Sequence, residues 1–237
     1  MSEPGEELVV LRHAAQLGRT DVLKQAISSI RALCSSDQEA SVMISSGVGE
    51  DDSTALHIAA FHGHPDVIRA LLTAGADPAV IPARGEYTGK KVYDVATDKV
   101  KETISVFLLE QIAMGNNETI SRLLAPSTGI PAPLTDGSRT EDTSLHWACS
   151  FSNEEATNIL IRAGIDVNKC NTLGQTALHV ACKGGNTNII RAIVKAKCNV
   201  TAVDNNGKSA LDMASGSVFF CITSSLFFYI HIFSFLL

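Results

Sequence analysis

Apolar positions recur in short, similar groups along this 237-residue chain. The pair Val67-Ile68 is followed by Leu71-Leu72, and the pair Ile189-Ile190 is followed by Ile193-Val194. Apolar residues at i, i+1, i+4 and i+5 form one face of a short helix, and a Gly before each group ends a preceding helix. The pattern therefore predicts units that consist of a helix, a tight turn, a second helix and a loop to the next unit.

One six-residue motif precedes these helix pairs. It reads TALHIA at 54–59, TSLHWA at 143–148, TALHVA at 176–181 and SALDMA at 209–214, so the last three copies begin 33 residues apart. Similarity at a fixed short period indicates a stacked repeat array. At these residues the chain resembles the ankyrin repeat family, whose repeat has this length and a Thr-Pro-Leu-His-x-Ala core motif. We expect an all-α ankyrin-repeat solenoid, because neither helix of a unit could bury its apolar face alone.

Agreement with the repeat is strong at 53–80 and 142–214 and weaker elsewhere. We count five or six units, some of them degenerate, with KVYDVA at 91–96 as a degenerate motif copy. Surplus residues at 34–49, rich in Ser and Gly, are expected to form a loop. The expected organisation is a degenerate N-terminal unit and loop at 1–50, repeats at 51–127, a Pro-containing insertion at 128–141, repeats with a truncated last unit at 142–216, and a hydrophobic tail at 217–237.

Glycine follows the second helix in two units, at Gly75 and Gly164. These glycines are expected to adopt a left-handed cap, which has no steric cost for Gly. Lys197 stands at the equivalent position of a third unit. We expect this departure to cost that cap a fraction of a kcal/mol.

The C-terminal tail differs in composition from the array. Six of the nine Phe lie between residues 218 and 237, and no charged residue follows Asp212. A helix of this length would span roughly 30 Å, the thickness of a bilayer core. Only Lys208 stands nearby as a basic flank, and several polar residues interrupt the apolar run. Three interpretations stay open: a membrane segment, a product of intron read-through or alternative termination, and a packed cap.

Composition excludes several functional classes. The net charge of −6 argues against a general nucleic-acid surface. No CxxC pair is present, and Cys149 and Cys182 occupy one repeat position, so they are interpreted as buried thiols in a reducing compartment. The N-terminal residues lack the pattern of a signal peptide. We expect a cytoplasmic or nuclear protein, or alternatively an array that faces the cytosol from a membrane anchor at 217–237.

Candidate catalytic and metal sites are explained by the repeat itself. His57, His62 and His64 are close in sequence, but the resemblance implies that His57 and Thr54 form hydrogen bonds that tie one unit to the next. His146 with Thr143, and His179 with Thr176, are expected to do the same. The neighbouring Cys149 and Cys182 therefore follow from the motif and do not indicate a nucleophile–base pair. We expect no enzyme activity, no cofactor and no metal.

Function is then expected from protein recognition. The resemblance implies that a partner docks on the concave side, at loop tips and at the exposed face of each first helix. The candidate contact residues are Glu50, Asp51, Phe61, His62, Arg139, Asp142, Phe151, Thr172, Leu173, Gln175, Lys183, Asn205 and Asn206. Phe61 and Phe151 are the most informative, because exposed aromatic side chains dominate many interfaces. The alternative is that an insertion covers each of them, and Trp147 is expected to serve packing.

The prediction is thus a non-enzymatic scaffold that binds another protein. The alternative is the cytosolic ankyrin portion of a membrane-anchored protein, of the channel or acyltransferase type.

Overall fold

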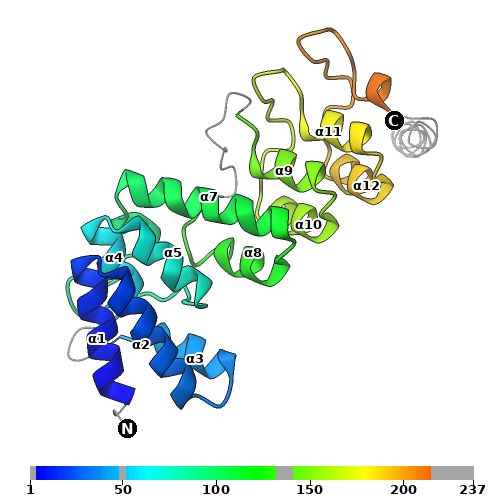
Figure 1. Ribbon diagram of the computed structural model, residues 1–237. Helices are drawn as coiled ribbons and strands as arrows, with labels where there is room; N and C mark the ends of the chain where they lie inside the picture. Colours follow the sequence, from blue (N-terminus) through cyan, green and yellow to red (C-terminus); the bar gives the residue numbers. More distant parts are fainter. Residues whose placement is uncertain (1–3, 48–51, 132–140, 215–237) are drawn as a thin grey trace. The chain divides into compact units, whose positions relative to one another are not determined.

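The computed structural model describes residues 4–47, 52–131 and 141–214 (Figure 1). Within these ranges the regular structure consists of twelve α-helices and one 3₁₀ helix, and the β pairing consists of two isolated bridges. The all-helical class expected from the motif is confirmed. The chain divides into two compact units: the first unit comprises Met1–Leu108 and Ser121–Ile130, and the second unit comprises Leu109–Ile120 and Pro131–Leu237.

The first unit is built from helix pairs joined by tight turns. Its helices are α1 (Pro4–Leu17), α2 (Thr20–Leu33), α3 (Asp37–Ile44), α4 (Ala55–His62), α5 (Pro65–Thr73) and α6 (Val92–Val95). Helix α1 packs on α2 and α4, and α5 packs on α4 and α2. Gly18 and Gly63 form the turns within the pairs with φ values of 70° and 72°, a region that Gly enters without steric cost. Leu23, Leu56 and Ile68 are buried in the resulting core.

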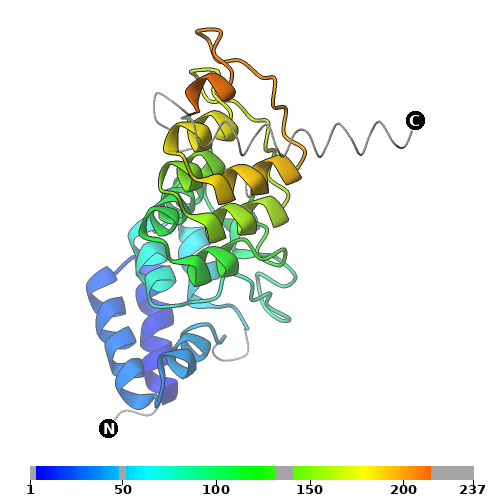
Figure 2. The same cartoon turned by 90° about the vertical axis from the view of Figure 1, so that its right-hand side faces the viewer.

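The second unit repeats this arrangement. Its complete helices are α9 (Ser144–Ser150), α10 (Glu154–Arg162), α11 (Ala177–Gly184) and α12 (Thr187–Lys195), followed by the 3₁₀ helix η1 (Leu211–Met213). The first helices α9 and α11 lie side by side, and so do the second helices α10 and α12 (Figures 1 and 2). Leu145, Leu160, Leu178 and Ile190 fill the core between them and are at most 1 % exposed. Two further helices, α7 (Asp98–Met114) and α8 (Asn117–Leu123), contain residues of both units.

The prediction of a loop at 34–49 is wrong for residues 37–44, which form α3. The Ser36 hydroxyl caps this helix by accepting a hydrogen bond from the Glu39 backbone N–H at 3.1 Å. The Glu39 carboxylate accepts in turn from the backbone N–H of Ser35 at 2.8 Å. Ala40 and Ile44, four residues apart, are buried. Serine here begins a helix, because its hydroxyl satisfies an unpaired N–H of the first turn.

The caps that follow the second helices agree with the predicted glycine positions. Gly75 and Gly164 have φ values of 98° and 82°, and Lys197 has a φ of 62°. An L-residue in the left-handed region costs about 1 kcal/mol because its Cβ approaches the following carbonyl oxygen. Lys197 is therefore a locally strained residue at the end of α12.

Among the described residues, no helix is both long enough and apolar enough to cross a bilayer. The hydrophobic segment 217–237 lies outside the described residues.

Candidate partner-binding surface

A buried histidine joins each complete motif to the loop before the next one. In the second unit, the backbone N–H of Thr143 donates to His146 Nδ1 at 3.2 Å, so the neutral ring carries its proton on Nε2. His146 Nε2 lies 2.8 Å from the carbonyl oxygen of Gln175 and donates to it. The equivalent bonds join His57 Nε2 to Lys90 O and His179 Nε2 to Lys208 O, both at 3.2 Å. The connections implied by the resemblance are present, with all three rings at most 1 % exposed.

Aspartate replaces histidine in the motif copies at 91–96 and 209–214. The Asp94 carboxylate accepts from the backbone N–H of Lys91 at 3.1 Å, and the Asp212 carboxylate accepts from that of Ser209 at 2.8 Å. A carboxylate can take the role of Nδ1 but has no proton to donate to the next loop. These motifs therefore retain the helix cap and lack the connecting donor.

Two loops in the second unit form narrow fingers, closed by the isolated bridges Cys170–Thr176 and Val203–Ser209. In the first finger (170–176), Asn171 Oδ1 accepts from the backbone N–H groups of Leu173 and Gln175, each at 3.0 Å. Asn171 Nδ2 donates to Asp142 Oδ1 at 2.7 Å. Asn171 thus fixes both the shape of the finger and its attachment to the preceding loop.

The second finger (203–209) has the same design with an aspartate. Asp204 Oδ1 accepts from the backbone N–H groups of Asn206 and Lys208, each at 2.9 Å. The Lys208 N–H is the largest of the interactions that hold the pKa of the buried Asp204 carboxyl below its usual value, and the Gln175 side chain adds to them. Hydrogen bonds to the charged form stabilise the carboxylate.

The tips of the two fingers are joined directly. The Asn205 backbone N–H donates to the carbonyl of Leu173 at 3.0 Å, and its side-chain Nδ2 donates to the carbonyl of Thr172 at 2.9 Å. The Leu173 side chain remains 48 % exposed, and Thr172 and Asn205 are exposed. The fingers therefore present one connected edge whose backbone is already ordered.

The predicted contact residues other than Phe61, His62 and Phe151 divide into three groups. Thr172, Leu173, Lys183, Asn205 and Asn206 are exposed on the second unit. Asp142 and Gln175 are half-buried, and their side chains hold the fingers in place. Glu50, Asp51 and Arg139 lie outside the described residues. Contact with a partner stays a prediction for all of them.

Phe151 lies at the C-terminal end of α9, and the fingers lead into the N-terminal ends of α11 and η1. Its ring stacks on Trp147, with centroids 5.5 Å apart and planes inclined by 30°. It is nevertheless 52 % exposed. Trp147 thus supports one side of Phe151 and leaves the other side accessible.

Phe61 occupies the last turn of α4 in the first unit. Its ring centroid lies 5.4 Å from that of the exposed His62 and 5.4 Å from that of Tyr87, which is buried in the loop after α5. Phe61 is 48 % exposed. The loop after α5 therefore covers part of the Phe61 ring and leaves about half of it accessible, and contact of this residue with a partner stays a prediction.

The motif histidines and cysteines are poorly placed for nucleophilic catalysis or metal binding. Both ring nitrogens of His146 have hydrogen-bond partners, and Cys149 is 1 % exposed. Burial raises the pKa of the Cys149 thiol, whereas a nucleophilic cysteine needs a lowered one. Across the described ranges, no group of three or more His, Cys, Asp or Glu side chains is arranged to hold a metal ion.

The hydrogen bonds of Asn171 and Asp204 that close the fingers were not predicted from the sequence, although the sequence contains a signal for them. Asn171 and Asp204 are 33 residues apart, and each is followed three residues later by a glycine, Gly174 or Gly207. Both glycines have a φ of 74°. An Asx-x-x-Gly pattern at the repeat period indicates a turn closed by the Asx side chain.

Two family models match segments of this chain. The model of the family described as "Ankyrin repeat" matches residues 51–81. The model described as "Ankyrin repeats (3 copies)" matches residues 145–222, which extends past Gly216, where we expected the similarity to end. Among solved structures, the chain is similar to the ankyrin repeat domain of human ASB11, with 22 % identity, a TM-score of 0.44, and coverage of 91 % of this chain and 96 % of that chain. From the matched segments, which contain the motif histidines His57, His146 and His179 and both fingers, we conclude that this chain belongs to the ankyrin repeat family.

Proposed function

We propose that this chain is a non-enzymatic scaffold, and that a protein partner docks on the fingers and the first helices of the second unit. Ankyrin repeats in general mediate protein–protein interaction. The choice of this surface rests on the two hydrogen bonds that join Asn205 to the carbonyls of Thr172 and Leu173, because they order an exposed edge before any partner binds. We define the docking surface as Thr172, Leu173, Asn205 and Asn206 at the tips, with Phe151 and Lys183 on the helices.

The ordered tips lower the cost of binding. A flexible loop loses conformational freedom when it docks, at about 0.5–1.5 kcal/mol for each immobilised side chain. Because Asn205 already holds the backbone of both tips, the backbone part of this ordering is complete before a partner binds. Preorganisation of this kind raises affinity without a new contact.

The exposed apolar groups supply the driving force. A Phe side chain buries roughly 200 Å², and Phe151 is 52 % exposed, so covering the accessible half would contribute about 2.5 kcal/mol. Leu173, at 48 % exposure, adds a smaller contribution of the same kind. Apart from Lys183, the defined surface carries no formal charge, so it suits a partner with apolar and neutral hydrogen-bonding groups.

Site-specific photo-crosslinking tests this assignment. A benzophenone amino acid is placed at Leu173 or at Phe151 in the full chain, and the matched controls carry it at the exposed Arg162 of α10 and Lys195 of α12. We expect the same partner to be crosslinked from both docking positions and not from the controls. Equal crosslinking from all four positions, or from the controls alone, would contradict the proposed surface.

We further propose that Phe61 and His62 form a second contact point on the first unit. Tyr87 supports the Phe61 ring from its buried side, as Trp147 supports Phe151. The exposed half of Phe61 is thus held in a fixed orientation, which suits it to anchor a partner. Crosslinking from position 61 to the partner already captured from position 173 would support this contact, and capture of nothing there would remove it.

We also propose that the scaffold works in the cytoplasm. Fractionation of cells that express the full chain, with carbonate extraction of the membranes, tests this location. Recovery in the soluble fraction supports it. Carbonate-resistant membrane association that disappears on deletion of 217–237 would favour the anchored alternative.

A further inference from the structure

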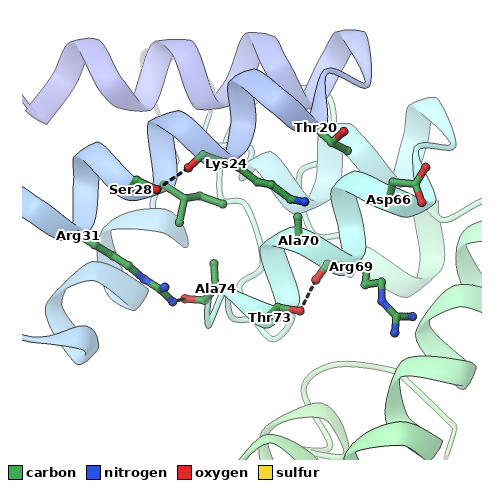
Figure 3. A pocket seen from close by; sticks show the side chains of 10 residues that line it. Thr20, Lys24, Ser28, Arg31, Asp66, Arg69, Ala70, Thr73 and Ala74 are labelled. Atoms are coloured by element: carbon green, nitrogen blue, oxygen red, sulfur yellow. Dashed lines mark hydrogen bonds between the residues drawn. The ribbon is translucent and has the colours of Figure 1, made fainter.

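A second candidate surface lies between α2 and α5, which are the second helices of two successive pairs (Figure 3). The groove has a volume of about 640 Å³. Ile27 and Ala74, which are 6 % and 8 % exposed, line it together with Ala70. The two alanine side chains are small, which leaves room for a main chain to approach α5.

Cationic side chains dominate the walls of this groove. Lys24 and Arg31 come from α2 and Arg69 comes from α5, whereas Asp66 is the one carboxylate among the described lining residues. In Figure 3, Lys24 extends from α2 toward α5, and Arg31 extends toward the Ala74 carbonyl. The positive balance is local, because the whole chain has a net charge of −6.

The Arg31 guanidinium is held in place across the groove. One of its terminal nitrogens donates to the carbonyl of Ala74, the C-cap residue of α5, at 3.4 Å. Carbonyl groups at a helix C-terminus attract cations. A guanidinium carries five N–H donors, so this bond positions the group while engaging one of them.

The hydroxyl groups of the groove are committed to their own helices. Ser28 Oγ donates to the carbonyl of Lys24 at 2.9 Å, and Thr73 Oγ1 donates to the carbonyl of Arg69 at 2.7 Å. Their protons therefore point into the backbone. The donors that a ligand would meet from α2 are the ammonium of Lys24 and the guanidinium of Arg31, which favours an anionic ligand.

We propose that this groove binds an extended acidic peptide segment of a partner protein, with two carboxylates that contact Lys24 and Arg31. These residues are seven apart on α2, so their Cα atoms are about 10 Å apart along the helix. A peptide in the extended polyproline II conformation advances about 3.1 Å per residue and has three residues per turn, so carboxylates three residues apart lie on one face at about this distance.

A peptide fits better than a polyanion. Strong nucleic-acid binding requires many Lys and Arg contacts to phosphates, and the groove offers three cations beside Asp66. A membrane surface would reach exposed side chains but not the apolar residues at the base of a groove between two helices. The shape and the limited positive charge together favour a short carboxylate pair on an extended chain.

Fluorescence anisotropy with the full chain tests the proposal. The probes are fluorescein-labelled Gly-Ser peptides that carry two Glu residues three positions apart, the same two Glu six positions apart, or two Gln three positions apart. At low ionic strength, we expect the first peptide to bind at least about tenfold more tightly than the other two. Added salt should weaken it, because exposed charges are screened.

Two double variants, each of which removes two positive charges, locate the site. Lys24→Gln with Arg31→Gln should weaken the first peptide at least about tenfold, with an unchanged circular dichroism spectrum. The control, Arg191→Gln with Lys195→Gln, removes two exposed cations from α12 and should leave binding unchanged.

Several results would overturn the proposal. They are equal binding of the Glu and Gln peptides, equal loss in both double variants, or no binding up to about 1 mM peptide. Tighter binding of phosphatidylserine vesicles or a single-stranded oligonucleotide, lost in the Lys24/Arg31 variant, would assign the groove to a different class of ligand.

Discussion

Replacement of His146 by alanine tests whether the motif histidine connects neighbouring repeats. The imidazole is 1 % exposed and bonds on one side to Thr143 and on the other to the carbonyl of Gln175. His146→Ala removes both connections and leaves a cavity the size of the ring. The N-terminal cap of α9 and the attachment of the first finger to this helix should therefore weaken together.

The expected cost follows from the groups left unpaired. A buried donor or acceptor without a partner costs about 1–3 kcal/mol. The variant leaves two such groups, the Thr143 N–H and the Gln175 carbonyl, which together would cost about 2–6 kcal/mol, and water that enters the cavity offsets part of this cost. We therefore expect a loss of about 2–5 kcal/mol, a large share of the roughly 5–15 kcal/mol that stabilises a typical domain.

Urea denaturation followed by far-UV circular dichroism measures this loss. The control is Lys183→Ala, an exposed change in α11 that should cost less than about 0.5 kcal/mol. Native-state hydrogen exchange adds a local measurement, because amides of the first finger should exchange faster in His146→Ala. A change within 0.5 kcal/mol of the Lys183→Ala value, with unaltered finger exchange, would refute the connecting role.

Three further changes address stability. Lys197→Gly should raise the free energy of unfolding by about 0.5–1 kcal/mol, because Gly accepts the φ of 62° without strain; an unchanged or lower thermal midpoint would count against this explanation. Folding lowers the pKa of the Asp204 carboxyl, so this group stabilises the folded wild type above its unfolded pKa of about 4, and the stabilisation is lost as the pH falls through the folded pKa. Asp204→Asn removes this contribution. Urea titrations of both proteins at about pH 6 and pH 3 should show the difference shrinking, and a constant difference would contradict it. Leu178→Ala, at a position 1 % exposed, should cost about 2–5 kcal/mol in the same assay, and a loss below 1 kcal/mol would mean that the site is not part of the core.

The helix pairs could be predicted because their information is local. The TALH motif and the apolar pairs at i, i+1, i+4 and i+5 mark the beginning and the buried face of each helix within about ten residues. Helix α3 was missed for the opposite reason, since Ser36 is compatible with a loop until the Glu39 cap and the burial of Ile44 are seen.

The surfaces depend on residues far apart in the chain. Asn205 donates to the carbonyl of Thr172, which lies 33 residues away in the sequence, and the residue type at position 205 alone does not predict that hydrogen bond. The α2–α5 groove brings Arg31 to the carbonyl of Ala74 at a separation of 43 residues. Exposure of Phe151 could be expected from its repeat position, but its stacking on Trp147 required the structure.

The most direct test of the account measures the affinity of the crosslinked partner for chains with truncated aromatic anchors. Phe61→Ala with Phe151→Ala should weaken binding by at least about tenfold at an unchanged free energy of unfolding. The control Val9→Ala with Leu17→Ala removes apolar side chains of α1 that are each 55 % exposed, and it should leave the affinity unchanged. Full affinity in the double Phe variant, or an equal loss in the α1 control, would contradict the claim that these aromatic side chains are the binding anchors of the array.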